Sequence, residues 1–473
     1  MKRYMSVAFF VLSIALIAVR CQENGTTGAL PNFVMFIGDD HGVYHSNPYG
    51  AEEIQTPNMQ AMADEGMQFM RAYVASPSCA PSRAALLTGL MPYRNGIVGN
   101  HERVRREGVE PLLPILANSG YEIAWYGKVG HGPGSDSGPG VTVIPYSKKA
   151  KKGYNQRLDI ADVEGFLKDR KDKTRPLALF VGSRYPHQPW PEPETARIQP
   201  HDIVVPPKTF DTPETRLEMT RYVEAVEILD RKIGAVRALV NTYMKPENTV
   251  MLYTSDHGQN WPFGKWSLYE TGIRTPIIAV WPGKIQPKST TRAMVSWIDI
   301  IPTFIDIAGG EVSQDIDGRS FKPVLLGEMD SHHNTIFATH KGDKDKNVYP
   351  IRSVRNEQWK YIRNLYPEFY HTTHMDLVPE DSPYCIRSWK SWVEASKTNP
   401  KAAAFLRAYH SRPAEELYRV EEDPYEKRNL ATEPQYKEVL EEMRAMVDMH
   451  MEEVGDDRSL SAEPRLLKDH PLP

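Results

Sequence analysis

Four short apolar runs in this sequence are each followed, within six residues, by residues that can carry charge. The runs and the residues that follow them are 32–37 with Asp39 and Asp40, 121–126 with Lys128, 177–181 with His187, and 249–254 with Asp256 and His257. Runs of this length and composition are typical of strands buried on both faces of a parallel sheet. Ligands bind at the carboxyl ends of such strands, so we expect these polar residues to meet at one edge of the sheet.

Helical patterns alternate with the apolar runs. In the clearest one, over about 221–241, apolar residues recur at steps of three and four. A shorter helix is expected over 81–87, directly after Cys79, and a further strand over 67–74. The alternation predicts an α/β fold with a large N-terminal domain, in which helices flank a doubly wound, mostly parallel sheet.

The pattern changes after about residue 343. The segments 351–355 and 358–363 predict a β-hairpin, 416–420 a third strand and 436–449 a helix. A chain of 473 residues also exceeds the roughly 250–300 residues that one core usually holds. We therefore predict a smaller C-terminal α+β domain with an antiparallel sheet. The expected division is a signal peptide at 1–21, a catalytic domain at 30–342, a C-terminal α+β subdomain at 343–455 and a mobile tail at 456–473.

The first residues predict export. Lys2 and Arg3 precede an apolar run over 7–19, which is shorter than the roughly 20 residues of a membrane span and is typical of a secretory signal. A periplasmic, secreted or cell-surface protein is expected, without a transmembrane span in the mature chain. A lipid anchor on Cys21 is a less favoured alternative, because Arg20 occupies a position where such signals have a small residue.

Composition narrows the function classes. There are 57 Lys and Arg against 61 Asp and Glu, a net charge of −4, which argues against a nucleic-acid partner. Only three cysteines occur, Cys21, Cys79 and Cys385, so a disulfide framework is not expected. Cys385 is interpreted as a packed small side chain.

Three carboxylates and an imidazole are candidate metal ligands: Asp39, Asp40, Asp256 and His257. Carboxylates converge only where a cation offsets their repulsion, and oxygen-rich ligation selects Ca²⁺ or Mg²⁺, with Mn²⁺ open because of the imidazole. The alternative is that adjacent aspartates only cap turns. Cationic candidates follow the same strands or lie near them: Arg83, Lys128, His131, His187 and Lys265. A hard metal combined with such cations suits a tetrahedral oxyanion, sulfate or phosphate.

The nucleophile is not settled by these residues. A thiolate at Cys79 would face a helix N-terminus, whose dipole favours the charged form. A thiol is nevertheless a soft ligand beside a hard cation.

The segment Ser78-Cys79-Ala80-Pro81-Ser82-Arg83, followed by Leu86-Leu87-Thr88-Gly89, resembles the signature of the formylglycine-dependent sulfatases. In that family the cysteine is oxidised after synthesis to an aldehyde. Further blocks agree in order over about 31–450: Gly38-Asp39-Asp40, Gly127-Lys128 with His131, Pro186-His187, Thr254-Ser255-Asp256-His257-Gly258, Lys265-Trp-Ser-Leu-Tyr-Glu270 and Glu416-Leu417-Tyr418 with Asn429-Leu430.

The resemblance implies a role for each candidate residue. Asp39, Asp40, Asp256, His257 and the modified Cys79 would hold Ca²⁺, the usual ion of the family. Cys79 would become 3-oxoalanine (formylglycine) through a formylglycine-generating enzyme, and its hydrate would be the nucleophile. The cations implied in binding the hydrate or the sulfate are Arg83, Lys128, His187 and Lys265, and His131 would be the base that regenerates the aldehyde.

The resemblance also bears on the substrate. Tyr349-Pro350-x-Arg352-Ser353-Val354 and Asn429-Leu430-Ala431-Thr432 look most like the branch that contains heparan N-sulfatase (sulfamidase). His257, Lys265 and the Lys128-x-x-His131 spacing differ from that branch, and the spacing is similar to that of iduronate sulfatases. N-sulfate and O-sulfate of a glycosaminoglycan-type polysaccharide therefore both stay open, and we expect an exo-acting glycan sulfatase.

Two other functions are alternatives. A phosphoric or phosphonic monoester hydrolase of the same alkaline-phosphatase-like superfamily shares the oxyanion chemistry, although no second metal cluster is evident in the sequence. A non-catalytic sulfated-glycan binder would result if Cys79 stayed unconverted. Asp299 is interpreted as a helix-entry residue. His332, His333 and His340 are interpreted as a solvated loop, with the lining of a specificity pocket as the alternative.

Overall fold

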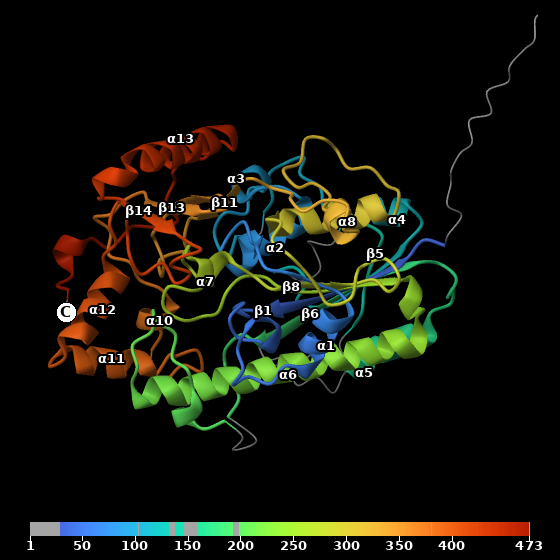
Figure 1. The fold of residues 1–473 in the computed structure, drawn as a ribbon, viewed down its shortest axis with the longest axis horizontal. Helices are drawn as coiled ribbons and strands as arrows, with labels where there is room; N and C mark the ends of the chain where they lie inside the picture. Colours follow the sequence, from blue (N-terminus) through green and yellow to red (C-terminus); the bar gives the residue numbers. More distant parts are fainter. Residues whose placement is uncertain are drawn as a thin grey trace, which may run out of the picture.

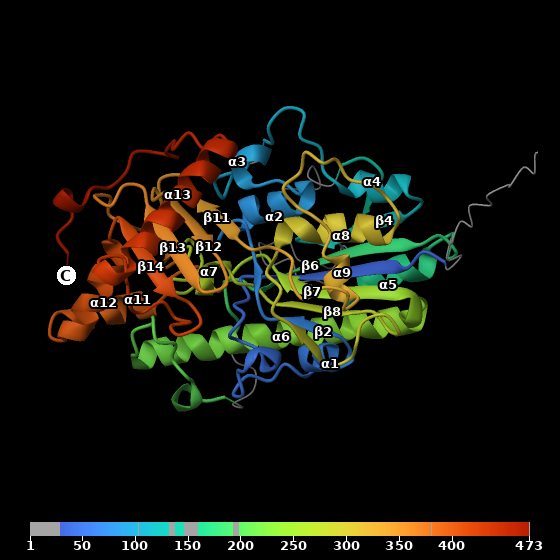
Figure 2. The ribbon, with the colours of Figure 1, turned by 45° about the horizontal axis from the view of Figure 1, so that its top comes forward.

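A computed structural model of the chain describes residues 29–102, 104–131, 138–145, 159–192, 198–379 and 381–472. The expected signal peptide and Cys21 lie outside these residues. Within them, eight strands form one mixed, mostly parallel sheet (Figures 1 and 2). In spatial order the strands are β5 (Val141–Val143), β4 (Glu122–Gly127), β6 (Leu177–Pro186), β1 (Asn32–Asp39), β7 (Thr249–Ser255), β8 (Ile277–Val280), β2 (Met67–Phe69) and β9 (Ser289–Thr291).

Helices cover both faces of this sheet, as Figure 1 shows. Alternate residues of β1 enter two different cores: Phe33 and Met35 lie in one, Val34 and Phe36 in the other. The helices over the first face are α2 (Cys79–Thr88), α4 (Leu113–Asn118) and α8 (Ile300–Ile307), and those over the second are α1 (Pro57–Glu65), α5 (Ile160–Asp169) and α6 (Pro213–Tyr243). The predicted doubly wound α/β domain is thus confirmed.

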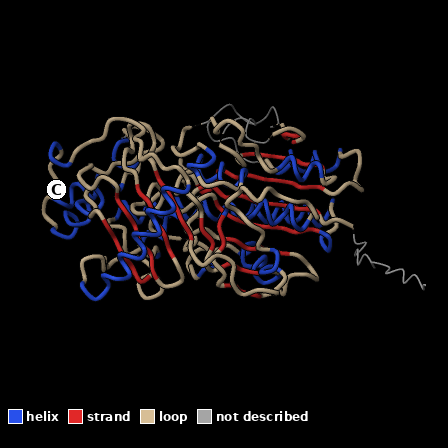
Figure 3. Tube along the Cα trace, turned by 90° about the horizontal axis from the view of Figure 1, so that it is seen from above, coloured by secondary structure: helices blue, strands red, loops and turns tan. Residues whose placement is uncertain are grey.

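The C-terminal part contains a second sheet, seen beside the first in Figure 3. It is antiparallel, with the order β11 (Ile336–His340), β12 (Ile351–Arg355), β13 (Trp359–Asn364) and β14 (Glu415–Arg419). The helix α13 (Lys437–Glu453) packs on it through Met443 and Val447. The predicted hairpin, third strand and helix are confirmed, and β11 is an additional strand.

The remaining described elements are short apart from two helices. The helices are α3 (Pro92–Asn95), α7 (Glu270–Ile273), α9 (Lys322–Leu325), α10 (His374–Leu377), α11 (Ser388–Ser396) and α12 (Pro400–His410). The 3-10 helices are η1 (Asn47–Tyr49), η2 (Pro200–Asp202), η3 (Pro246–Asn248), η4 (Trp297–Asp299), η5 (Pro434–Tyr436) and η6 (Leu467–Asp469). No described helix is long and apolar enough to cross a membrane.

One predicted strand, 67–74, is wrong as a single element. Its first part, β2, pairs with β8 and β9 in the large sheet. Its second part, β3 (Ala72–Tyr73), pairs instead with β10 (Val295–Ser296) in a separate two-stranded sheet. Between β2 and β3 the chain passes from the large sheet to the two-stranded sheet. The apolar pattern of the sequence predicts a strand but not the sheet in which the strand pairs.

Candidate active site

The predicted carboxylates meet at the carboxyl ends of β1 and β7. Asp39 ends β1, Asp40 follows it in the left-handed backbone region at φ 66°, and Asp256 follows β7. One oxygen of each lies within 4.8 Å of the others, and all three side chains are buried. His257 joins them, with Nε2 at 3.4 Å from Asp40 Oδ1.

Three cations neutralise these carboxylates. Lys128 Nζ donates to Asp39 Oδ2 at 2.7 Å, Lys265 Nζ to Asp40 Oδ1 at 2.8 Å. Arg83 Nε donates to Asp256 Oδ2 at 2.9 Å. Burial alone would raise the pKa of Asp39, but Lys128 and its neighbours hold it well below the usual value. The three positive and three negative formal charges cancel within the cluster.

The donor set fits a hard divalent cation. Asp39, Asp40 and Asp256 offer oxygen atoms, and His257 offers one nitrogen. The Nδ1 atom of His257 lies 2.9 Å from the carbonyl oxygen of Gly258 and donates to it, so the lone pair of Nε2 faces the carboxylates. Oxygen-rich ligation with a single imidazole is typical of Ca²⁺, Mg²⁺ or Mn²⁺.

Cys79 lies beside this cluster as the first residue of α2. Its Sγ is 3.3 Å from His257 Nε2, 3.5 Å from Lys265 Nζ and 3.7 Å from Asp39 Oδ1. Burial raises the pKa of the thiol to about 12 although Lys128 and Lys265 oppose this. The position at a helix N-terminus therefore does not by itself produce a thiolate at neutral pH.

Arg83 lies one turn after Cys79 on α2 and on the same face of the helix. Its side chain is fully buried and donates to the carbonyl oxygens of Lys128 and Val129 as well as to Asp256. A single guanidinium thus connects the helix that carries Cys79 to the carboxyl ends of β4 and β7.

Two histidines complete the predicted set. His187, after β6, has Nε2 at 3.9 Å from Asp40 Oδ2 and Nδ1 at 2.6 Å from the carbonyl oxygen of Gln188. Among the described residues, His131 Nδ1 is buried without a hydrogen-bond partner. Burial, with Lys128 and His101 nearby, lowers the pKa of His131 to about 2, so its ring is neutral at physiological pH.

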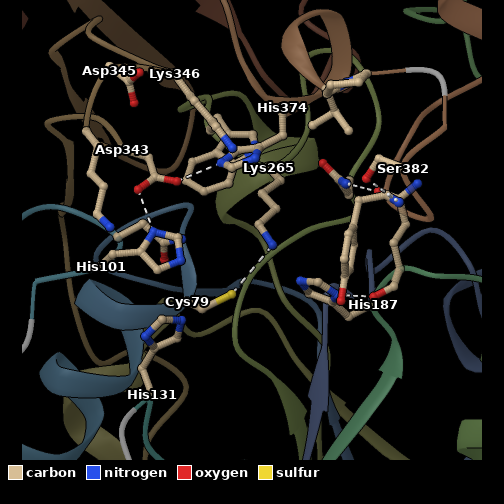
Figure 4. Close-up of a pocket in the computed structure, with 18 of the residues that line it drawn as sticks. Cys79, His101, His131, His187, Lys265, Asp343, Asp345, Lys346, His374 and Ser382 are labelled. Carbon is tan, nitrogen blue, oxygen red and sulfur yellow. Dashed lines mark hydrogen bonds and ion pairs between the residues drawn. The ribbon is translucent and has the colours of Figure 1, made fainter. Parts of the chain in front are cut away.

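Five of the predicted residues line a cavity of about 460 Å³ (Figure 4), within the usual size range of ligand sites: Cys79, Lys128, His131, His187 and Lys265. Cys79 lies at the floor, with His131, His187 and Lys265 pointing toward the same space. The structure therefore brings together every residue that the sequence analysis named for the site.

The opposite wall contains three residues that the sequence analysis missed. Asp343, 2% exposed, has Oδ1 at 2.6 Å from His101 Nδ1 and Oδ2 at 2.6 Å from His374 Nε2 (Figure 4). The ring of Trp266 stacks on His374 at 5.2 Å. Asp343, His101 and His374, which begins α10, lie far apart in the sequence, and no motif marks them, whereas Trp266 belongs to the block that contains Lys265.

Comparisons with known proteins agree with this geometry. A family profile described as Sulfatase matches residues 31–310, more than half of the chain, and one described as N-sulphoglucosamine sulphohydrolase, C-terminal, matches 257–381. An ulvan-active sulfatase of Formosa agariphila is 29% identical over 445 residues, covering 92% of this chain and 82% of its own. Human N-sulphoglucosamine sulphohydrolase is 26% identical over 469 residues, covering 89% of this chain and 90% of its own.

Solved structures share the fold. A 2-O GAG sulfatase superposes with a TM-score of 0.69 at 22% identity, covering 92% of this chain and 95% of its own. A phosphonate monoester hydrolase of Agrobacterium radiobacter also superposes, with a TM-score of 0.67 at 16% identity, covering 91% of this chain and 96% of its own. Fold alone therefore does not separate sulfate from phosphonate chemistry. The profile match over 31–310 shows that the chain belongs to the sulfatase family.

Proposed function

We propose that this enzyme removes sulfate groups from a sulfated polysaccharide or glycosaminoglycan-type saccharide, with a formylglycine made from Cys79 as its nucleophile. The observation that carries the proposal is the position of Cys79 within 3.7 Å of Asp39, His257 and Lys265 at the floor of an open cavity. An unmodified thiol with a pKa of about 12 is a poor nucleophile there. When formed, the hydrated aldehyde would supply one hydroxyl oxygen that bonds to sulfur as the saccharide oxygen or nitrogen leaves with a proton. Its second hydroxyl would then lose a proton, which re-forms the aldehyde C=O and breaks the C–O bond to sulfate.

In this proposal Asp39, Asp40, Asp256 and His257 hold a divalent ion, Ca²⁺ by the precedent of the family. When bound, the ion supplies two positive charges to a cluster whose own charges cancel, which favours an anionic substrate. Chelation should therefore remove activity, and Ca²⁺ should restore it.

The surrounding cations bind and orient the sulfate group. Lys128, Lys265 and His187 surround the space above Cys79 and stabilise charge that develops on sulfate oxygens. Arg83, held by Asp256, keeps the first turn of α2 in place. The buried Nδ1 of His131 has no partner among the described residues. An anionic sulfate bound beside Lys128 would offset the cations that lower the pKa of His131, so that Nδ1 can accept a proton.

The saccharide would contact the far wall of the cavity. Asp343 holds His101 and His374 so that each ring keeps one nitrogen for the ligand, and Trp266 supports His374. The saccharide-active relatives from Formosa agariphila and human support this substrate class. Export, with maturation by a formylglycine-generating enzyme, belongs to the same proposal and rests on residues 2–19 and on the block around Cys79.

The test has two parts. Mass spectrometry of the tryptic peptide that contains Cys79, from protein made in its native host, should show conversion of the thiol to the aldehyde. The matched Cys79→Ala protein should show an unmodified alanine peptide and release no sulfate. An intact thiol in an active enzyme would refute the mechanism, and an intact thiol in an inactive protein would favour a sulfated-glycan binder.

The second part separates substrates. The release of sulfate from N-sulfated and from O-sulfated oligosaccharides is measured. The hydrolysis of phosphonate monoesters of matched size is measured in parallel. Turnover of a sulfated saccharide with little phosphonate turnover supports the proposal. The reverse preference would favour the phosphonic monoester hydrolase.

A further inference from the structure

A second cluster of metal-ligating side chains lies outside the cavity that contains Cys79. It consists of Asp299, at the junction of η4 and α8, and of His332 and His333, between α9 and β11. Asp299 Oδ2 lies 2.8 Å from His333 Nε2 and 3.4 Å from His332 Nε2. One ligand atom from each residue lies within 4.8 Å of the other two, and none of the three lines the candidate active site.

Asp299 is held rigidly in this cluster. Its Oδ2 accepts the backbone N–H of Ser296 at 2.7 Å, and its Oδ1 accepts that of Arg319 at 3.0 Å. A fixed, charged oxygen supported by backbone donors is the usual environment of a carboxylate ligand.

His332 supplies an independent sign of a ligand. Its side chain is 7% exposed, and its Nε2 is buried without a hydrogen-bond partner while it faces Asp299. A buried ring nitrogen without a partner costs free energy, and a bound cation would accept its lone pair. The interpretation of His332 as part of a solvated loop is therefore wrong.

We propose that Asp299, His332 and His333 bind a Zn²⁺ ion at a structural site separate from the active site. Two imidazole nitrogens and one carboxylate oxygen are common zinc ligands, and a water can take the fourth position. With Zn²⁺ bonds of about 2.0–2.1 Å, tetrahedral ligand atoms lie about 3.3 Å apart. The distances of 2.8 and 3.4 Å from Asp299 Oδ2 bracket that value.

The surroundings allow such an ion to enter and stay. His333 is 16% exposed and lines a surface pocket, which gives the site access to solvent. The guanidinium groups of Arg71 and Arg292 at this pocket pair with Glu421, and Arg71 also pairs with Glu357, so two carboxylates offset the two positive charges. The ion would connect the segment around His332 to the start of α8 and so stabilise the face of the large sheet that α8 covers.

The experiment counts zinc in the full-length protein. The parent, His332→Gln, His333→Gln and the double variant are stripped with chelator, supplied with excess Ca²⁺ for the carboxylate cluster, and titrated with Zn²⁺. His201→Gln is the matched control, because His201 is 79% exposed and pairs only with Asp202 among the described residues. Elemental analysis, zinc affinity and melting temperature are measured for each protein.

The parent and His201→Gln should each retain one zinc that the double variant lacks, with a rise in melting temperature on zinc addition that the double variant does not show. Each single variant should bind zinc at least about tenfold more weakly, since even second-shell changes cost about 10- to 100-fold. Co²⁺ in the parent should give the strong visible absorption of a four-coordinate ion. Equal zinc content in the parent and the double variant, or no retained zinc in the parent, would overturn the proposal. Sulfate release is expected to be the same in the parent and in every variant.

Discussion

At the scale of single residues, the candidate active site depends on buried carboxylates and buried cations whose charges cancel. Lys265 contacts both Asp40 and Cys79, so its ammonium serves the metal cluster and the reacting centre together. Buried cations of this kind stabilise developing negative charge strongly, because little water screens them.

We expect Lys265→Ala to lower kcat/KM for a sulfated saccharide by about 100- to 1000-fold, the size typical of losing one preorganised donor. The matched control is Lys346→Ala, on the exposed rim of the same cavity, which should change kcat/KM by less than about tenfold. Steady-state kinetics at equal folded fraction, checked by thermal unfolding, measures both. A Lys265→Ala enzyme within tenfold of the parent would contradict the role.

A second residue-scale prediction concerns pH. Burial raises the pKa of Asp376 from 3.8 to about 7, and its Oδ1 accepts from the Thr373 backbone and the Tyr409 hydroxyl. Between these two values the native protein retains a proton that the unfolded chain has released. The stability contributed by this group is therefore complete below about pH 4 and decreases as pH rises to about 7.

Asp376→Asn keeps an oxygen acceptor but cannot titrate. Urea unfolding of both proteins measures the free energy of unfolding at each pH. Between pH 4 and 7 this free energy should fall by at least about 1 kcal/mol more in the parent than in the variant. Parallel stability profiles over that range would show that the Asp376 carboxyl does not titrate as stated.

At the scale of elements, the site depends on how closely β4 and β6 approach. Gly182 on β6 accepts the backbone N–H of Lys128 at 2.8 Å, and a Cβ at Gly182 would overlap the carbonyl group of Lys128. That carbonyl also accepts from Arg83. A side chain at Gly182 would therefore displace Lys128 and Arg83 together.

Gly182→Ala should destabilise the protein by about 1–3 kcal/mol and reduce sulfate release, because backbone must move to accommodate the methyl group. Gly165→Ala in α5 is the matched control: nothing lies within 4 Å of its Cβ, and it should stabilise the helix by about 0.5–1 kcal/mol without affecting activity. Chemical denaturation and kinetics of the two variants provide the comparison. Equal behaviour of the two alanine variants would contradict the steric argument.

At the scale of the whole molecule, buried charges join the two sheets. Lys360 on β13 is fully buried, with Nζ at 3.2 Å from Glu270 Oε1 and 3.1 Å from Glu426 Oε1. Glu270 begins α7, directly after the segment that carries Lys265. The C-terminal sheet is thus linked electrostatically to the loop that supplies the active site.

Lys360→Met should cost about 3–5 kcal/mol of unfolding free energy, because it removes the ion-pair partner of buried Glu426 and one of the cations beside buried Glu270, which keeps Arg355 at 3.4 Å. Lys397→Met, which removes an exposed partner of Glu394, should cost less than about 0.5 kcal/mol. Equilibrium unfolding in denaturant measures both. A small loss at Lys360 would show that the link between the sheets does not depend on this pair.

The sequence by itself determined the four central strands β1, β4, β6 and β7, the doubly wound class and the residues at the ends of these strands. Asp39, Lys128, His187 and Asp256 each follow an apolar run, and parallel strands deliver their carboxyl ends to one edge of a sheet. The local apolar pattern therefore predicted which residues, distant in the sequence, meet at the sheet edge. The block around Cys79 indicated the family.

Only the tertiary structure decided which loops meet. Asp343 joins His101 and His374, and Asp299 joins His332 and His333, across separations that no local pattern records. The same holds for Lys360 and Glu270. Loop conformations and the packing of one sheet against another depend on many contacts between residues that are distant in the sequence. The buried face of a strand or helix, in contrast, is indicated by the spacing of apolar residues within that element.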